Sequence, residues 1–305
     1  MAPEKENTPP EIPKIDFSAP KLQPGTENWS EVRAKVMNAL ESYGCFEAVF
    51  PRVSPEARRT FLSSLEDLFA LPVETKERNV SDIPYFGYFG RLPYLPLMEG
   101  IGIFNAGLPA TVQDFCDLMW PQGNPNFREM VISLVGQIKE LDHMVRRMVV
   151  ESLGVLDKYY ESHIESTEYL FRMMKYRGTE RDQGTQQQGL VEHTDSNTIT
   201  ILFQNHVMGL QVQTKDGDWI PAETSPESFI VLAGASLMAW TNGRVHAAHH
   251  RVMMEGKEER YSVALFSVPR AGYLVQAPEE LVDEKHPLLF KPFDCIEIEL
   301  EKSGY

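Results

Sequence analysis

Cysteines and long apolar runs are both scarce in this sequence of 305 residues. Its three cysteines, Cys45, Cys116 and Cys295, lie far apart and show no Cys-x-x-Cys spacing. This argues against a disulfide framework or a structural zinc site and is typical of a protein in a reduced cytosol. The longest mainly apolar stretch, Phe229 to Trp240, is much shorter than a membrane-spanning helix requires. We expect this stretch to form buried strands.

Basic charge is also low, with 29 Lys and Arg residues against 44 Asp and Glu residues, a net charge of −15 and a pI near 5.0. Binding to nucleic acid or to an anionic membrane needs a basic surface, so we expect neither partner. Residues 1–10 are polar and proline-rich and lack the basic start and apolar stretch of a secretory signal. We therefore expect a mobile tail at residues 1–10 and a cytoplasmic protein.

The length and a hydrophobic content of 42% favour a single domain, 1–305. Its N-terminal part, 11–165, has apolar residues at helical spacing. We expect helices over 29–43, with Asn28 as the N-cap, from Ser54-Pro55 to Leu71-Pro72, and over 126–153.

From residue 166 to residue 300 the pattern changes to short strands separated by turn dipeptides such as Asp216-Gly217 and Asn242-Gly243. Many short strands after a helical half predict an α+β fold. We expect a double-stranded β-helix, or jelly roll, flanked by helices that come mainly from the N-terminal half.

A histidine and an aspartate two residues apart, His193 and Asp195, lead into an apolar strand. Because residues two apart in extended chain project from the same face, both side chains can reach one ion. A third ligand is available in residues 242–252, which contain His246, His249 and His250. Two imidazoles and one carboxylate form the facial triad of non-haem Fe(II) oxygenases, although an isolated His-x-Asp motif is weak support for a metal site.

Residues Arg260 and Ser262 follow on an alternating strand, in which Tyr261, Val263 and Leu265 take the other face. An arginine and a hydroxyl on one strand face can hold a carboxylate through charge-assisted hydrogen bonds. The alternative is an arginine paired with a surface carboxylate of this acidic chain. The alternation favours an inward-facing arginine, which needs an anion.

Taken together, His193-x-Asp195, His250-Arg251-Val252 and Arg260-x-Ser262 resemble the plant 2-oxoglutarate-dependent dioxygenases in order and approximate spacing. The segments Ile12 to Asp16, Tyr43 to Phe46 and Lys291 to Phe293 are also similar to segments of that family. Within the family, the sequence is most similar to the specialised-metabolism clade, which includes glucosinolate side-chain dioxygenases and steroidal-alkaloid hydroxylases. The segments that carry this similarity are Tyr43 to Glu47, Leu71-Pro72 and Gly123 to Phe127.

The resemblance implies that His193, Asp195 and His250 bind Fe(II), with the iron site in the jelly-roll core. It also implies that 2-oxoglutarate chelates the metal and that its far carboxylate meets Arg260 and Ser262. Tyr176 occupies the position of a family tyrosine that assists in binding this carboxylate. The family's Asn-Tyr-Tyr-Pro motif reads Met174-Lys175-Tyr176-Arg177 here, so the asparagine contact is absent. His250 precedes Arg-Val as in the family, and in a strand His249 takes the opposite face. Ascorbate is an expected reductant.

Residues 83–105 are rich in proline, glycine and aromatic residues without a helical period, and they either cap the core or line a pocket. His246 is either a polar group that lines the pocket or an exposed histidine near the Asn242-Gly243 turn. We expect an apolar substrate pocket lined by Tyr85, Phe86, Tyr88, Phe104, Phe115, Trp120, His246 and Phe266.

The expected function is hydroxylation of a small, largely apolar plant metabolite by a monomeric enzyme that uses O2 and releases succinate and CO2. Desaturation, demethylation and ring closure use the same ligands in the family, so the motifs leave the outcome open. Two alternatives are an oxidase of the same fold that uses ascorbate, and a jelly-roll protein that binds a small molecule without catalysis.

Overall fold

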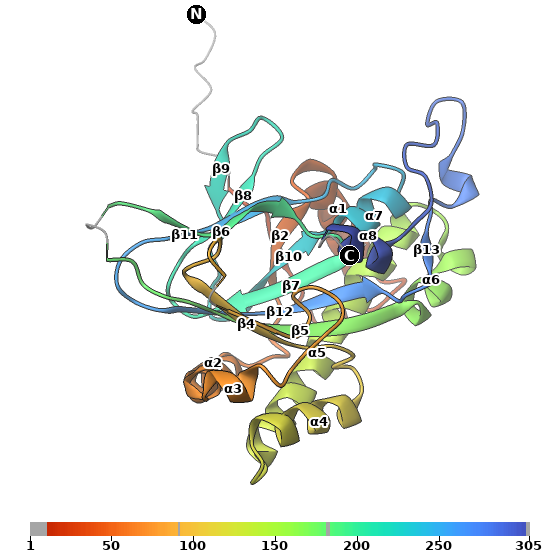
Figure 1. Ribbon diagram of the computed structural model, residues 1–305. Coiled ribbons are helices and arrows are strands. Elements are labelled where there is room, and N and C mark those ends of the chain that lie inside the picture. The colour runs from red at the N-terminus through yellow and green to blue at the C-terminus, as the bar shows by residue number, and fades with distance from the viewer. Residues whose placement is uncertain (1–10, 91, 181–183, 303–305) are drawn as a thin grey trace, which may run out of the picture.

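The computed structural model describes residues 11–90, 92–180 and 184–302; the expected mobile tail, residues 1–10, lies outside these ranges. Most of the helices lie in residues 11–165, and most of the strands follow in residues 166–302 (Figure 1). The helices are α1 (Glu27–Ser42), α2 (Pro55–Ala70), α3 (Val73–Lys76), α4 (Pro109–Met119), α5 (Pro125–Ser152), α6 (Leu156–Glu165), α7 (Ala235–Trp240) and α8 (Cys295–Lys302). The strands are β1 (Lys14–Asp16), β2 (Cys45–Val49), β3 (Tyr88–Phe89), β4 (Met98–Ile103), β5 (Thr167–Tyr176), β6 (Gln187–Thr194), β7 (Ile199–Gln204), β8 (Leu210–Gln213), β9 (Trp219–Pro221), β10 (Ser228–Ala233), β11 (His249–Met254), β12 (Arg260–Pro269), β13 (Leu274–Val275) and β14 (Phe293–Asp294).

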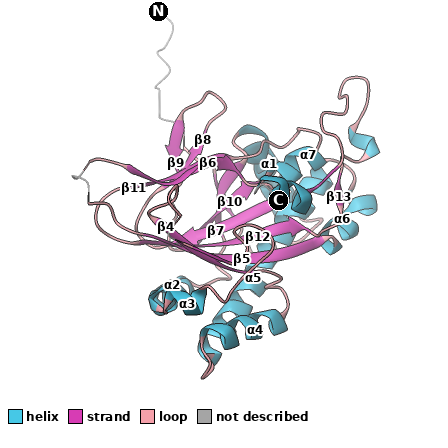
Figure 2. Ribbon diagram, in the orientation of Figure 1, coloured by secondary structure: helices cyan, strands magenta, loops and turns pink. Residues whose placement is uncertain are grey.

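Two sheets form the core. The large sheet has the order β1-β2-β10-β7-β12-β5-β4-β3, and the small sheet has the order β6-β11-β8-β9. An apolar cluster fills the space between them and contains Leu202 and Ala264 of the large sheet and Val212 and Val252 of the small one. Helices α2, α4 and α5 lie on the other side of the large sheet (Figure 2). The expected α+β fold with a jelly-roll core is confirmed.

Strand β12 in the middle of the large sheet shows how the sequence distributes side chains between the two layers. Tyr261, Val263 and Leu265 belong to the cluster beneath the helices, whereas Ala264 and Phe266 belong to the cluster between the sheets. Side chains in a strand alternate between faces with a period of two. Even-numbered residues of β12, including Arg260, therefore face the small sheet.

The expected helices form, with small differences at their ends. Helix α1 begins two residues earlier than expected, because the Thr26 hydroxyl, not Asn28, accepts a hydrogen bond from the Trp29 amide at 3.2 Å. Helix α2 begins after the expected cap, Ser54. The stretch from Phe229 to Trp240 was wrongly expected to be strand throughout: after β10 the chain turns at Gly234 into helix α7.

None of the helices in the described ranges is both long enough and apolar enough to cross a membrane.

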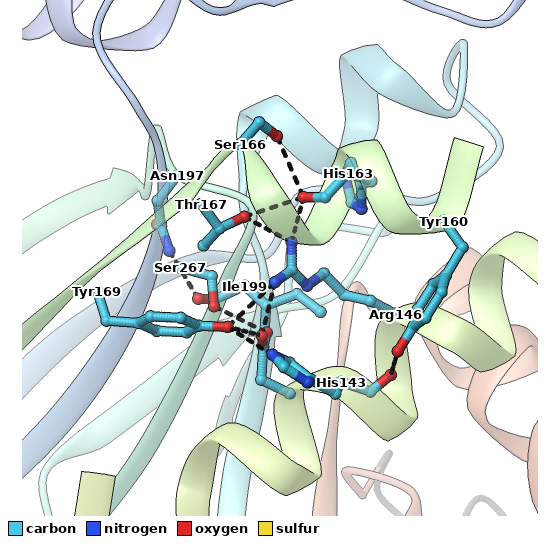
Figure 3. A network of polar contacts seen from close by, with 11 residues as sticks. His143, Arg146, Tyr160, His163, Ser166, Thr167, Tyr169, Asn197, Ile199 and Ser267 are labelled. Carbon is cyan, nitrogen blue, oxygen red and sulfur yellow. Dashed lines mark hydrogen bonds and ion pairs between the residues drawn. The ribbon is translucent and has the colours of Figure 1, made fainter. Parts of the chain in front are cut away.

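A fully buried ion pair joins the helical layer to the large sheet. Arg146 of α5 donates from Nη2 to Oδ2 of Asp142 at 2.9 Å and from Nη1 to the carbonyl of His163 at 3.0 Å. Asp142 also accepts from Tyr169 Oη at 2.8 Å and from Ser267 Oγ at 2.7 Å. Figure 3 shows Arg146 with Tyr169 and Ser267, which come from strands β5 and β12. Each oxygen of the buried carboxylate is therefore paired, as its burial requires.

Replacing Asp142 with alanine should lower the free energy of unfolding by about 3–5 kcal/mol, because it leaves the Arg146 guanidinium buried without its counter-ion. Urea unfolding measures this change. Glu140→Ala on the same helix provides the control: it breaks an exposed ion pair with Arg52 and should cost less than about 1 kcal/mol. Equal effects of the two substitutions would contradict a stabilising role for the buried pair.

Candidate metal centre and co-substrate site

Three side chains that could hold a metal converge at one end of the small sheet. His193 of β6 lies directly opposite His250 of β11 in the strand register, with ring centroids 4.2 Å apart. Asp195 follows β6, and its Oδ1 lies 3.5 Å from His193 Nε2 and 3.9 Å from His250 Nε2. The three ligand atoms all lie within 4.8 Å of one another. Two imidazoles and one carboxylate in this arrangement fit Fe(II) and leave the other side of the ion open.

Backbone contacts fix the orientation of both imidazoles. Nδ1 of His193 lies 2.9 Å from the carbonyl oxygen of Val191, and Nδ1 of His250 lies 3.1 Å from that of Ala248. Because a carbonyl oxygen can only accept a hydrogen bond, each Nδ1 carries the proton. Each Nε2 then presents its lone pair to the space beside Asp195, as a metal ligand must.

The position of Asp195 depends on the turn that links β6 to β7. Its Oδ2 accepts a hydrogen bond from Thr200 Oγ1 at 2.6 Å, and its carbonyl oxygen accepts one from the Ala235 amide at 2.7 Å. Gly234 makes this close approach possible, since a Cβ there would lie 2.0 Å from the carbonyl oxygen of Asn197. These contacts leave Oδ1 of Asp195 directed to the two histidines.

Burial and mutual contact set the protonation of the three groups. Burial lowers the pKa of His250 to about 4, which keeps this imidazole neutral. Burial raises the pKa of Asp195, but His250, His193 and Thr200 outweigh it and hold that pKa below its usual range. Burial lowers the pKa of His193, but the hydrogen bond and charge of Asp195 outweigh it and raise the pKa. At a pH below the raised pKa of His193, metal binding must displace a proton from its imidazole.

A second polar group, Arg260, is fully buried on the face of β12 that looks toward the small sheet. Its Nη2 donates to Gln204 Oε1 at 2.6 Å, its Nη1 to Ser262 Oγ at 3.2 Å, and its Cζ lies 4.9 Å from the Tyr176 ring centroid. No carboxylate of the described residues forms an ion pair with it. A buried guanidinium with neutral neighbours fits an anionic ligand.

Both groups line one cavity of about 320 Å³ between the two sheets. Its wall includes all three candidate metal ligands together with Arg260 and Tyr176. Most of the remaining lining is apolar and aromatic. This arrangement can hold a metal ion and a carboxylate ligand beside an apolar molecule.

The comparisons with known proteins agree with this chemistry. Residues 158–269 match the 2OG-Fe(II) oxygenase superfamily, and residues 12–93 match the family described as non-haem dioxygenase in morphine synthesis N-terminal. AOP1 of Arabidopsis thaliana, named a probable 2-oxoglutarate-dependent dioxygenase, is 47% identical over 287 residues, which cover 93% of this chain and 94% of that protein. The protein belongs to the 2OG-Fe(II) oxygenase superfamily.

Solved structures support the same assignment. The complex of 2-oxoglutarate with AtDAO1, a dioxygenase for auxin oxidation from Arabidopsis thaliana, has a TM-score of 0.82 and 27% identity, covering 91% of this chain and 100% of that chain. JOX2 in complex with 2OG, Fe and JA has a TM-score of 0.79 and 26% identity, covering 95% and 84%. The chain is thus a 2-oxoglutarate-dependent dioxygenase, and the expected cofactors, Fe(II) and 2-oxoglutarate, are confirmed.

The structure brings three of the eight expected pocket residues to the dioxygenase cavity: Tyr85, Phe86 and Phe266. Two of them come from the aromatic segment 83–105, which both caps the core and lines the cavity. Phe104 of that segment lies behind Phe86, with ring centroids 5.1 Å apart, and Tyr88 turns away to donate to Glu99 at 2.8 Å. Neither side chain is part of the cavity lining.

Phe115, Trp120 and His246 were also wrongly expected in the pocket. Phe115 and Trp120 pack against Phe127 of α5, so they lie on the helical side of the large sheet and not between the sheets. His246 precedes β11 and does not line the cavity; its amide donates to the carbonyl of Leu40 at 3.0 Å.

Several groups of the dioxygenase site were not expected from the sequence. Thr200 orients Asp195, Gln204 contacts Arg260, and Arg172 lines the cavity. A signal for Arg172 was present, because it alternates with Leu170, Met174 and Tyr176 in the same way that Arg260 alternates in its strand.

His250→Ala should weaken Fe(II) binding by more than about 100-fold, because it removes one of three ligand atoms. His249→Ala should retain iron, since the His249 ring lies on the opposite face, 5.8 Å from the Trp219 ring. Iron content after anaerobic loading and desalting measures both effects, with circular dichroism as the control for folding. Equal loss of iron in the two variants would show that the histidine assignment is wrong.

Proposed function

We propose that His193, Asp195 and His250 bind Fe(II) and that Arg260 and Ser262 bind the far carboxylate of 2-oxoglutarate, with Tyr176 beside them. The proposal rests on one observation above all: the three candidate ligands line the same cavity as Arg260, which is buried and has no carboxylate partner among the described residues. A dicarboxylate such as 2-oxoglutarate can bind the metal at one end and Arg260 at the other.

In this proposal the residues of the chain mainly position and shield the reacting groups. Fe(II) with 2-oxoglutarate and O2 supplies the oxidising chemistry and yields succinate and CO2. The carbonyls of Val191 and Ala248 hold Nε2 of each histidine toward the metal, and Thr200 holds Asp195. The aromatic wall excludes water from the substrate carbon.

We propose hydroxylation of a small, largely apolar plant specialised metabolite as the reaction. A cavity of about 320 Å³ suits a small organic molecule, and Phe86, Phe89 and Phe266 give it aromatic walls. Two similar proteins are associated with small molecules: AtDAO1 is a dioxygenase for auxin oxidation, and the JOX2 structure is a complex with JA. Desaturation uses the same site and is distinguished by the product.

We also propose that residues 11–165 and 166–300 form one domain that acts as a cytoplasmic monomer. Strands β1 to β4 of the first part join β5, β7, β10 and β12 of the second in one sheet, which supports a single unit. The three cysteines are buried and free, in keeping with a reduced compartment.

Arg260→Gln should raise the KM for 2-oxoglutarate by about 100-fold and change kcat less, because charge-assisted bonds to the far carboxylate are lost. Arg260→Lys should give an intermediate KM, since it keeps the charge without the bidentate geometry. Succinate release at varied 2-oxoglutarate measures both. An unchanged KM in the glutamine variant would contradict the assigned role of Arg260.

Incubation with a fractionated plant metabolite extract should release succinate and give a product one oxygen atom heavier than its substrate. Mass spectrometry of the active fraction identifies the pair, and a product two hydrogen atoms lighter would indicate desaturation. His193→Ala is the control, because it should show no succinate release. Turnover driven only by peptides or oligonucleotides would contradict a small-molecule substrate.

A further inference from the structure

A second arginine of the cavity, Arg172, is not among the residues assigned above to the metal or to the far carboxylate of 2-oxoglutarate. It lies on β5 and alternates with Leu170 and Met174, which belong to the apolar cluster between the sheets. Its Cζ lies 4.7 Å from the ring centroid of Phe266 and 5.9 Å from that of Phe89. The guanidinium is therefore held against two aromatic rings in the cavity wall.

The guanidinium has no hydrogen-bonded or ionic partner among the described residues, and its Nε is buried without one. Burial lowers the pKa of Arg172, while the charges of Asp195 and Glu299 raise it. An arginine nevertheless keeps its proton under all ordinary conditions. A partly desolvated cation with free donors in a ligand cavity is costly unless a ligand pairs with it.

The register of the large sheet separates Arg172 from the co-substrate site. Tyr176 lies opposite Arg260 across β5 and β12, whereas Arg172 lies opposite Ala264. Four residues along a strand correspond to roughly 13 Å, so a carboxylate bound at Arg260 does not also satisfy Arg172. The cavity thus has two cationic positions on one wall.

We propose that Arg172 binds a carboxylate or sulfonate group of the organic substrate and so selects a molecule with an apolar body and one anionic end. This inference rests on the proposed function and adds the charge of the substrate to it. The rings of Phe89 and Phe266 hold the guanidinium in place, and its planar donors pair with two oxygens of the anion. Arg172 thereby orients the substrate with respect to the metal ligands.

The test compares two fluorescent probes that share one aromatic body: 8-anilinonaphthalene-1-sulfonate and uncharged N-phenyl-1-naphthylamine. Both are titrated into the anaerobic protein loaded with Fe(II) and saturating 2-oxoglutarate, so that Arg260 is already occupied. Arg172→Gln should weaken binding of the sulfonate about tenfold or more and leave binding of the neutral probe unchanged. Arg172→Lys should weaken the sulfonate less, because the charge remains.

Arg251→Gln is the matched control, since Arg251 also stacks on an aromatic ring, 4.0 Å from the Trp219 centroid, but does not line the cavity. It should leave both affinities unchanged. The proposal is overturned if wild type fails to bind the sulfonate, if Arg172→Gln leaves its affinity unchanged, or if both probes weaken equally. Should the glutamine variant not fold, the lysine variant decides: a smaller loss of sulfonate affinity with the neutral probe unaffected supports the proposal, and an unchanged sulfonate affinity overturns it.

The visible charge-transfer band of the Fe(II) and 2-oxoglutarate complex separates this inference from the proposed function. Wild type, Arg172→Gln and Arg251→Gln should all develop the band. Its absence in wild type would contradict the proposed co-substrate site, while the probe titration in metal-free protein would still report on Arg172. A normal band with no preference for the sulfonate would contradict only the role of Arg172.

Discussion

In the small sheet, His250 of β11 lies directly opposite His193 of β6, and the candidate metal centre depends on this cross-strand pair. Side chains alternate between faces along a strand, so a slip of one residue would turn His250 away and bring His249 to the cavity face. Asp195 lies beyond the end of β6 and relies on a separate set of contacts from Thr200 and Ala235. The site therefore combines strand register with a turn that only a glycine at 234 permits.

The large sheet supplies cations to the cavity, and its two faces carry different chemistry. Arg260 and Arg172 project toward the small sheet from neighbouring strands, with Ser262 and Gln204 beside Arg260. The opposite face buries apolar side chains under the helices, together with the Asp142–Arg146 pair. That network and apolar packing hold the helical layer on one face, while the other face carries the two arginines of the largely apolar cavity.

The apolar walls and the charged positions of the cavity have different consequences for ligand binding. Aromatic rings provide non-directional affinity for a small organic body, whereas each arginine demands an anion in a defined place. One anion is a feature of 2-oxoglutarate, and the second is what we infer for the substrate. Specificity then follows from where the charge sits relative to the metal ligands.

Local spacing and alternation in the sequence determined the Arg260 strand, the main helices and the jelly-roll class. The sequence also determined the metal ligands proposed here, but the choice of His250 among the three histidines came from the resemblance to the family. It did not determine which aromatic residues line the cavity. Phe115 and Trp120 occur in a pattern as aromatic as that of Phe86, but their helix packs on the outer face of the sheet. Nor did it show that Gln204 contacts Arg260, or that Nε of Arg172 is buried without a hydrogen-bond partner among the described residues. Local periodicity decides the face from which a side chain projects, and only the packing of the layers decides what lies opposite that face.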